Sequence, residues 1–183
     1  MRIVALSGSL RSGSYNTALA KALAELAPAD CEIEVATPAG IPVYDGDLEA
    51  EQGVPDAVER LKDRVAAADG LILVTPEYNQ GVPGTFKNAI DWMSRPSSDI
   101  GRVFRGRPVA LCGASPGGFG TKSSQNAWLP TLRALKLRLY SGHSLFVSGA
   151  DQRFDEAGTL VDEDLRKSAT NFMHGFCAFV RGA

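Results

Sequence analysis

The chain has 183 residues, of which 44% are hydrophobic and 22% charged, proportions typical of a globular protein that exclude a disordered or fibrous chain. The length fits one α/β domain over residues 1–183 better than two domains. The formal net charge of −2 provides no positive field for nucleic acid, so DNA and RNA are not expected partners.

Short apolar runs alternate with amphipathic stretches along the chain, a pattern typical of βαβ units around a mostly parallel sheet. In chain order, the pattern predicts a strand at 2–7, a helix at about 16–26, a strand at 32–36, a helix from about 55, a strand at 70–75, a helix from 83 or 84 to 93, a strand at 108–114, a helix at about 122–137, a strand within 138–148 and a last helix from 162 or 164.

Residues 37–53 are polar, with Pro38, Pro42 and several glycines, and predict a long surface loop that is a candidate cover for part of a site. Pro130 removes a backbone donor from the helix at 122–137 and predicts a kink or offset there. The last helix carries an apolar stripe, which we interpret as core packing and not as a cofactor site. Its members are Leu165, Ala169, Phe172, Phe176 and Phe179.

The three cysteines, Cys31, Cys112 and Cys177, lie far apart and form no Cys-x-x-Cys pair, which favours reduced thiols over a zinc site or a redox disulfide. No apolar run approaches the roughly 18 residues of a membrane span, and the start lacks the apolar core of a signal peptide. We therefore expect a cytoplasmic protein with no membrane partner and no bound metal.

Ligands of an open parallel sheet bind beyond the carboxyl ends of its strands, which directs attention to the loops after the first, third and fourth strands. The first loop leads into a helix, whose free N–H groups favour a phosphate. Hydroxyls of Ser9 and Ser14, the Asn16 amide and the Arg11 guanidinium could complete the phosphate shell. The loop lacks both the Gly-x-Gly-x-x-Gly and the Gly-Lys-Ser/Thr pattern, so a phosphate monoester is favoured over a pyrophosphate or Mg-ATP. An ordinary turn and helix cap is the alternative.

The second loop, residues 75–84, has two glycines and two prolines, and such an irregular backbone can aim N–H and C=O groups at a flat heterocycle. Tyr78 could add a ring face and Asn79 an amide. The alternative is a polar turn, with Trp92 as a core anchor and Lys87 with Asp91 as a surface ion pair. The third loop, residues 114–120, is rich in glycine and suits close approach to a neutral ring, although an ordinary turn would have the same composition.

Two motifs carry a resemblance: Gly-Ser-Leu-Arg-x-Gly-Ser-x-Asn at 8–16 and Pro-Glu-Tyr-Asn-x-x-x-Pro-Gly-x-x-Lys-Asn-Ala-Ile-Asp-Trp at 76–92. Together they resemble the NAD(P)H-dependent FMN reductase family, which includes quinone, azo-dye and chromate reductases, over nearly the whole chain. The resemblance implies a flavodoxin-like three-layer α/β sandwich with a five-stranded parallel sheet. The chain departs from the family at Gln80-Gly81-Val82, which varies among relatives, and at Phe86, where Leu is common.

The resemblance also implies FMN as cofactor, with hydride passing from NADH or NADPH to a small acceptor: a quinone, an azo compound, a chromate-type oxyanion or free flavin. It further implies ping-pong kinetics, a homodimer or homotetramer, and no catalytic side chain, since the chemistry belongs to the cofactor. The cofactor-binding residues that it implies are Ser9, Arg11, Ser14, Tyr15, Asn16, Pro76, Glu77, Tyr78, Asn79, Ser115 and Gly117.

Three other functions are compatible with parts of the pattern. A flavodoxin-type electron carrier would bind FMN but is usually strongly acidic, and the net charge here is −2. A flavin-binding regulatory module would lack turnover of its own. A phosphoacceptor receiver domain needs acidic residues at the ends of the first and third strands, where this chain has Ser7 and Thr75.

His143 and His174 lie away from the three loops, and we expect them to be structural or surface residues.

Overall fold

The computed structural model describes residues 1–182 and contains a parallel sheet at its centre. The strands lie in the order β2 (Glu32–Ala36), β1 (Arg2–Ser7), β3 (Gly70–Val74), β4 (Pro108–Ala114) and β5 (Arg138–Leu139), and β6 (Leu145–Val147) also pairs with β4. This 2-1-3-4-5 order is flavodoxin-like, so the predicted fold is confirmed. The order reverses between β1 and β3, and ligands bind at that point in such sheets.

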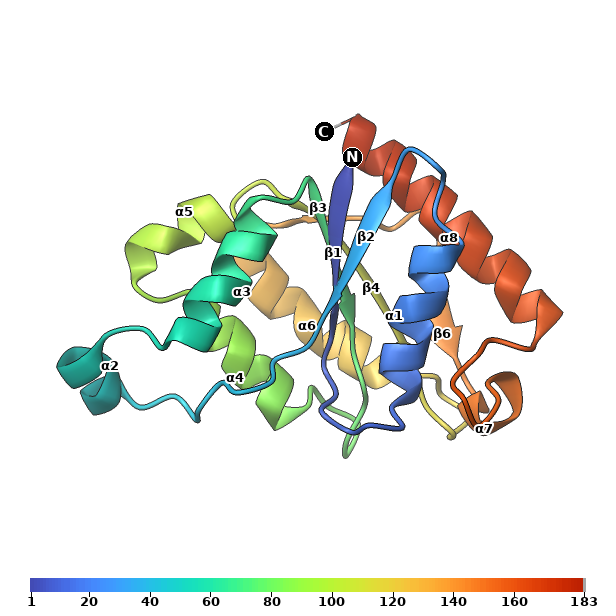
Figure 1. Ribbon diagram of the computed structural model, residues 1–183, viewed down its shortest axis with the longest axis horizontal. Coiled ribbons are helices and arrows are strands. Elements are labelled where there is room, and N and C mark those ends of the chain that lie inside the picture. The colour runs from blue at the N-terminus through green and yellow to red at the C-terminus, as the bar shows by residue number, and fades with distance from the viewer. Residues whose placement is uncertain (183) are drawn as a thin grey trace.

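Helices cover both faces of the sheet (Figure 1). One face packs against α1 (Tyr15–Glu25) and α8 (Glu163–Arg181). The other packs against α3 (Asp56–Ala66), α4 (Gly84–Met93) and α6 (Lys122–Ala134). The two cores share the side chains of β1 alternately: Ile3 and Ala5 belong to the first core, and Val4 and Leu6 to the second. A strand buried on both faces reads as a continuous apolar run, which is why the sequence signal for the central strands was strong.

The predicted boundaries agree closely with the observed ones for most elements. Strands at 2–7, 32–36 and 108–114 are confirmed to the residue. The helix expected at 122–137 continues through Pro130 but ends at Ala134, because Lys136 adopts a left-handed backbone with φ of 59°. The strand expected within 138–148 is divided into β5 and β6, and the segment between them includes Tyr140, whose ring packs on the α8 rings of Phe172, Phe176 and Phe179.

Four short helices were not predicted. They are α2 (Gly46–Gln52), η1 (Ser97–Asp99), α5 (Ile100–Val103) and α7 (Ala150–Arg153). The prediction of a continuous loop over 37–53 is therefore wrong, since α2 lies within it. This helix buries no residue, and its N-cap residue is Asp45, whose side chain accepts a hydrogen bond from the Asp47 N–H. A helix without a buried face has no apolar periodicity, so the pattern could not indicate it.

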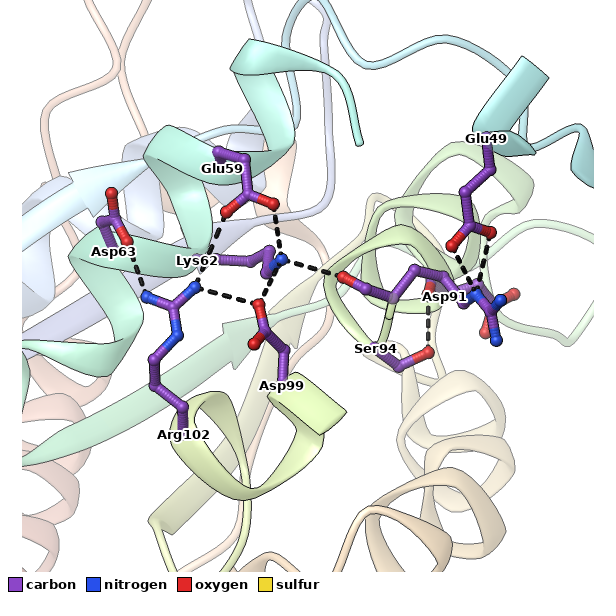
Figure 2. A network of polar contacts seen from close by, with 9 residues as sticks. Glu49, Glu59, Lys62, Asp63, Asp91, Ser94, Asp99 and Arg102 are labelled. Carbon is purple, nitrogen blue, oxygen red and sulfur yellow. Dashed lines mark hydrogen bonds and ion pairs between the residues drawn. The ribbon is translucent and has the colours of Figure 1, made fainter. Parts of the chain in front are cut away.

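The C-terminal end of α4 is held by a buried lysine (Figure 2). Lys62 on α3 has no exposed side-chain surface, and its Nζ donates to Glu59 Oε1 at 2.7 Å and to the carbonyl oxygen of Arg95 at 2.8 Å. The same Nζ lies 2.6 Å from Asp99 Oδ2. The three contacts match the three N–H donors of an ammonium group, and they join α3, the end of α4 and η1.

Two partly exposed arginines, Arg95 and Arg102, extend this polar network. Arg102 pairs with Asp63 at 2.6 Å and with Asp99 at 3.1 Å. Arg95 pairs with Glu49 of α2 at 2.8 Å, which ties the unpredicted helix to the end of α4. We call the set Glu49, Glu59, Lys62, Asp63, Arg95, Asp99 and Arg102 the Lys62 network.

Within residues 1–182, no helix combines the length and apolar character needed to cross a membrane.

Candidate functional site

The loops after β1, β3 and β4 meet at the carboxyl edge of the sheet, at the lower edge of the view in Figure 1. They enclose a cavity of about 80 Å³. Its lining residues are Ser9, Arg11, Ser14, Tyr15, Asn16, Pro76, Glu77, Tyr78, Ala114, Ser115 and Pro116. Of the residues predicted to bind a cofactor, all but Asn79 and Gly117 line this cavity. Ala114 and Pro116 line it without having been predicted.

The first loop brings two nearly buried hydroxyls to the N-terminus of α1. Ser14 is the N-cap residue, and its Oγ accepts a hydrogen bond from the Thr17 N–H at 3.3 Å. Ser9 and Ser14 are each 7% exposed. Gly8 permits this path, because a Cβ there would collide with the ring of Phe86. Unpaired N–H groups at the start of a helix and nearby hydroxyls form an environment that attracts anions.

Arg11 is the cationic member of the cavity lining. Its backbone N–H makes a long contact of 3.4 Å to Ser9 Oγ. The side chain is exposed, and within residues 1–182 no carboxylate lies within ion-pair distance of it. An arginine without a carboxylate partner beside a helix N-terminus is available for an anion.

Asn16 lines the cavity and also contacts the end of β4. Its Nδ2 donates to the Ala114 carbonyl oxygen at 2.9 Å, and its Oδ1 accepts from the Ala114 N–H at 2.9 Å. Both polar groups of the amide are therefore engaged by the end of β4, and the side chain is 5% exposed. Asn16 lines the cavity but also joins the first loop to the third, which sequence spacing alone could not indicate.

Glu77 of the second loop makes a contact that the sequence did not indicate. Its Oε2 accepts a hydrogen bond from the Ser124 N–H at 2.9 Å. Thr121, the residue before α6, provides no side-chain cap. Glu77 therefore caps the N-terminus of α6 from a distant loop, where a negative charge stabilises the helix dipole.

Behind Glu77, the hydroxyl of Thr75 uses all its hydrogen-bonding capacity. It donates to the Pro76 carbonyl oxygen at 3.0 Å and accepts from Trp128 Nε1 at 3.0 Å. It also lies 2.8 Å from Ser124 Oγ, which must then act as the donor in that contact. Thr75, Ser124 and Trp128 were not among the predicted site residues, because their partners are distant in sequence. Together with Glu77 they fix the base of the second loop against α6.

The tip of the second loop is a tight turn with two left-handed residues. Tyr78 and Gly81 pair through both of their backbone groups, with N···O distances of 2.9 and 3.3 Å. Between them, Asn79 has φ of 50° and Gln80 has φ of 58°. Positive φ at both central positions defines a type I′ turn. Asparagine tolerates this region and glutamine does not favour it, so Gln80 is a strained residue at the rim of the cavity.

The rim also exposes large apolar side chains. Leu10 on the first loop, Tyr78 on the second and Phe119 on the third are 54%, 55% and 74% exposed. A larger hollow of about 460 Å³ lies on the other side of Leu10, between the segment containing Ile41 and Val43 and the start of α4. Its lining is mainly apolar, whereas the hydroxyls of Ser9 and Ser14 and the Arg11 side chain line the smaller cavity. The smaller cavity is therefore the better candidate for an anionic ligand.

Residues that we predicted to be structural have structural contacts. Trp92 is fully buried and donates to the Pro42 carbonyl oxygen at 2.9 Å, which confirms it as a core anchor. Lys87 and Asp91 form an ion pair at 2.7 Å, as predicted. His143 lies 3.1 Å from Ser168 Oγ on α8 and does not line the cavity.

Comparison with known proteins gives consistent matches along the chain. A family model described as NADPH-dependent FMN reductase matches residues 1–152. The chain is 40% identical over 181 residues to an NAD(P)H-dependent FMN reductase of Pseudomonas aeruginosa, which covers 99% of this chain and 96% of the relative. It is 38% identical over 181 residues to a 2-hydroxy-1,4-benzoquinone reductase of a Burkholderia species, with 99% and 97% covered.

Among solved structures, the chain is similar to FerB, a flavoenzyme NAD(P)H:(acceptor) oxidoreductase from Paracoccus denitrificans. The TM-score is 0.87 at 31% sequence identity, and the match covers 99% of this chain and 97% of the other.

Proposed function

The chain belongs to the NADPH-dependent FMN reductase family, and from this premise we propose that it binds FMN in the 80 Å³ cavity and its rim and reduces small acceptors with NADH or NADPH. One observation carries the placement of the cofactor: the cavity combines the N-terminus of α1, two nearly buried serine hydroxyls and an arginine that has no carboxylate partner among residues 1–182. A phosphate monoester matches this set in charge and in hydrogen-bonding capacity.

The size of the cavity also favours the phosphate end of FMN. A cavity needs a volume of roughly 10–15 Å³ to hold one water. The cavity volume of about 80 Å³ therefore accommodates several phosphate oxygens but not a three-ring heterocycle. We therefore propose that Ser9, Arg11 and Ser14 hold the phosphate and that Tyr15 lies beside it. The ring system would extend over the open rim, beside Pro76, Tyr78, Asn79, Ser115 and Gly117.

Asn16 and Glu77 have positioning roles in this proposal. Asn16 joins the phosphate loop to the end of β4, and Glu77 joins the ring loop to α6. Both side chains thus set the spacing between loops that the cofactor must bridge. Such preorganisation reduces the ordering that binding would otherwise require.

When bound, FMN supplies the hydride chemistry, accepting from the nicotinamide and donating to the acceptor. The residues of the chain bind and orient the reactants, and we assign no side chain as a general acid or base. Leu10, Tyr78 and Phe119 give the rim an apolar surface on which a flat aromatic reactant can stack. Quinones, azo compounds, chromate-type oxyanions and free flavin are the proposed acceptors. Because nicotinamide and acceptor would occupy the same rim in turn, we expect ping-pong kinetics.

Cofactor extraction tests the binding proposal. We expect the purified protein to release FMN and to bind added FMN more tightly than FAD, since the cavity matches a monoester and not a pyrophosphate. Recovery of mainly FAD, or no binding of added FMN, would contradict the proposal.

Steady-state oxidation of NADPH and NADH with a quinone tests the activity. Turnover is expected with at least one nucleotide. Flavin binding without turnover would instead favour the electron carrier or the regulatory module.

We further propose that the protein acts in the cytoplasm as a homodimer or homotetramer with the flavin sites near a subunit interface. Support comes from the three large apolar side chains exposed at the rim, which a subunit interface would cover. Sedimentation at micromolar concentration should give at least twice the 19.4 kDa monomer mass. A fully active monomer would exclude this assembly.

A further inference from the structure

Two cysteines meet at the edge of the sheet opposite the flavin loops. Cys31 precedes β2 and Cys177 lies on α8, and the two are separated by 146 positions in the sequence. Their Sγ atoms are 3.1 Å apart. In Figure 1, the segment between α1 and β2 passes beside the C-terminal part of α8, close to both chain ends and far from the loops that follow β1 and β3.

Neighbouring contacts join the segment that precedes β2 to the C-terminal part of α8. Arg181 is four residues after Cys177 on α8, and residues at that spacing lie on the same side of a helix. Its Nη2 pairs with both carboxylate oxygens of Asp30, the residue before Cys31, at 2.6 and 2.7 Å. The N-terminal ammonium of Met1 donates to the Asp30 carbonyl oxygen at 3.1 Å. The proximity of the two sulfurs therefore follows from the packing of α8 against the segment that precedes β2, and not from an isolated side-chain rotamer.

We propose that Cys31 and Cys177 are an oxidation site that forms an intramolecular disulfide on exposure to a peroxide. An S–S bond is about 2.05 Å long, so the sulfurs need to approach by only about 1 Å from their present positions. Such a movement is within reach of small χ1 adjustments of both side chains.

The reaction balances with hydrogen peroxide as the oxidant. The thiolate of one cysteine attacks a peroxide oxygen, the O–O bond breaks, and a sulfenic acid and one water form after proton transfer. The sulfur of the second cysteine then attacks the sulfenic sulfur and the S–S bond forms. The S–O bond of the sulfenic acid breaks, and its hydroxyl takes the proton of the second thiol and leaves as a second water. The two thiols lose two electrons and two protons in total, and one peroxide becomes two waters.

Accessibility assigns the first step to Cys31. Cys31 as a residue is 8% exposed, whereas Cys177 is fully buried. Burial raises the pKa of Cys31, and burial together with the neighbouring Cys31 raises the pKa of Cys177 to about 12. Both thiols therefore stay protonated at neutral pH and react slowly, which makes the pair resistant to mild oxidants but open to sustained peroxide.

The bond would close a loop that contains most of the chain. Cross-linking distant positions restricts the unfolded chain, so the oxidised protein should be more resistant to unfolding. Because the pair lies at the far edge of the sheet from the three loops, we expect turnover to be unchanged. The inference does not rest on the proposed function, since it concerns the thiols alone.

The experiment uses the full-length holoprotein, reduced with a phosphine in the dark and then treated with excess hydrogen peroxide. Reaction with a thiol reagent after unfolding should show three thiols before treatment and 3 − 2 = 1 afterwards. Peptide mapping without reduction should recover a Cys31–Cys177 cross-link, two hydrogens lighter than the separate peptides. The melting temperature should rise by about 5–15 °C on oxidation and return on reduction.

Cys112 provides the matched control, because it is fully buried in β4 and has no thiol partner among the described residues. The Cys112→Ser variant should still lose two thiols on oxidation. The Cys31→Ser and Cys177→Ala variants should form no intramolecular disulfide. Mapping of the unaltered protein decides the question even if a variant folds poorly. Survival of all three thiols, oxidation of Cys31 to a sulfinic acid with Cys177 still free, or a cross-link between two chains would overturn the proposal.

Discussion

The two ends of α4 have opposite character. Its C-terminal end lies in the Lys62 network, where a fully buried ammonium has three oxygen partners and each arginine has a carboxylate. Its N-terminal end follows the second loop, where Gln80 adopts a strained backbone. Across the cavity from that loop, Arg11 has no carboxylate partner among the described residues and Leu10 is exposed.

This contrast separates structural from functional polar groups. Buried polar groups in native proteins are almost always paired, so the Lys62 network is what a stable fold requires. An exposed cation beside free N–H groups is not needed for the fold and is instead suited to a ligand. The difference predicts that substitutions in the network change stability, whereas substitutions at the rim change binding.

Lys62→Ala should have the largest effect on stability. It removes a buried cation and leaves the Asp99 carboxylate and the Arg95 carbonyl oxygen without that partner. The carboxylates of Glu59 and Asp99 that pair with Lys62 are both partly exposed. We therefore expect a loss of about 2–4 kcal/mol in the free energy of unfolding, somewhat below the loss for a fully buried ion pair. Urea unfolding followed by circular dichroism measures it.

Two further variants make this test specific. Lys62→Met retains most of the aliphatic stem and should lose less stability than Lys62→Ala. Lys167→Ala, at an exposed ion pair on α8, should stay within about 0.5 kcal/mol of the parent. If Lys62→Ala behaved like Lys167→Ala, the network would not be structural.

Arg11→Ala should have the opposite profile. The guanidinium has no carboxylate partner within residues 1–182, so its loss should leave the unfolding free energy nearly unchanged. The proposed charge-assisted contact with phosphate is equally present before and during turnover, so the dissociation constant for FMN should rise about tenfold to a hundredfold. Flavin fluorescence titration gives the constant, and the turnover number of FMN-saturated enzyme should change less.

Arg105→Ala is the matched control for this prediction, because Arg105 is also exposed but lies between α5 and β4. It should bind FMN like the parent. An unchanged dissociation constant in Arg11→Ala would remove Arg11 from the cofactor site and leave the helix N-terminus and the hydroxyls as the phosphate shell.

Acid should weaken the Lys62 network through Asp99. The hydrogen bond from Lys62, followed by that from Arg102, holds the pKa of Asp99 below its ordinary value of 3.8. A carboxylate whose pKa is lowered in the folded state stabilises the fold at every pH above its ordinary pKa. This contribution is lost as the pH falls from the ordinary pKa through the lowered pKa of the folded state. The stability difference between the parent and Asp99→Asn should therefore be constant near neutrality and shrink on acidification below about pH 4.

Urea midpoints measured from about pH 6 to about pH 3 would show this convergence. Asp164→Asn, which changes a side chain that is 92% exposed on α8, serves as the control for general acid effects. A difference that grows as the pH falls would mean that Asp99 does not depend on Lys62.

The sequence predicted the parts of the fold that depend on local patterns. Apolar runs such as Ile3 to Leu6 identified central strands, because burial on both faces leaves no polar position in them. Glycine-rich loops after three strands identified the cavity, because parallel strands end at one edge of the sheet. These signals lie within a few residues of one another.

The remaining features depend on partners distant in sequence. Lys62 resembles any polar helix residue until Asp99 and the Arg95 carbonyl oxygen are placed beside it. Glu77 was predicted as a flavin-loop residue, but its role as the cap of α6 requires knowing where Ser124 lies. Cys31 and Cys177 were interpreted as separate thiols for the same reason, since nothing in their spacing indicates that α8 returns to the start of β2.

The smallest expected effect concerns the strained turn at the rim. A left-handed backbone at a residue other than glycine costs roughly 1–2 kcal/mol, and a new glycine costs about 0.4–1 kcal/mol through the greater freedom of the unfolded chain. Gln80→Gly should therefore raise the free energy of unfolding by up to about 1.5 kcal/mol. Asn79→Gly should raise it less, because asparagine tolerates the left-handed region.

The pair of variants tests whether the rim stores strain, as the comparison of the two ends of α4 requires. Both positions are exposed, and the turn is closed by the backbone groups of Tyr78 and Gly81, which neither variant changes. A difference in stability between them thus reports the conformational cost of the residue at each position. Urea unfolding of the protein without added FMN measures that cost without any contribution from ligand binding. If Gln80→Gly were no more stable than Asn79→Gly, the turn would be relaxed, and the rim would differ from the Lys62 network only in its unpaired groups.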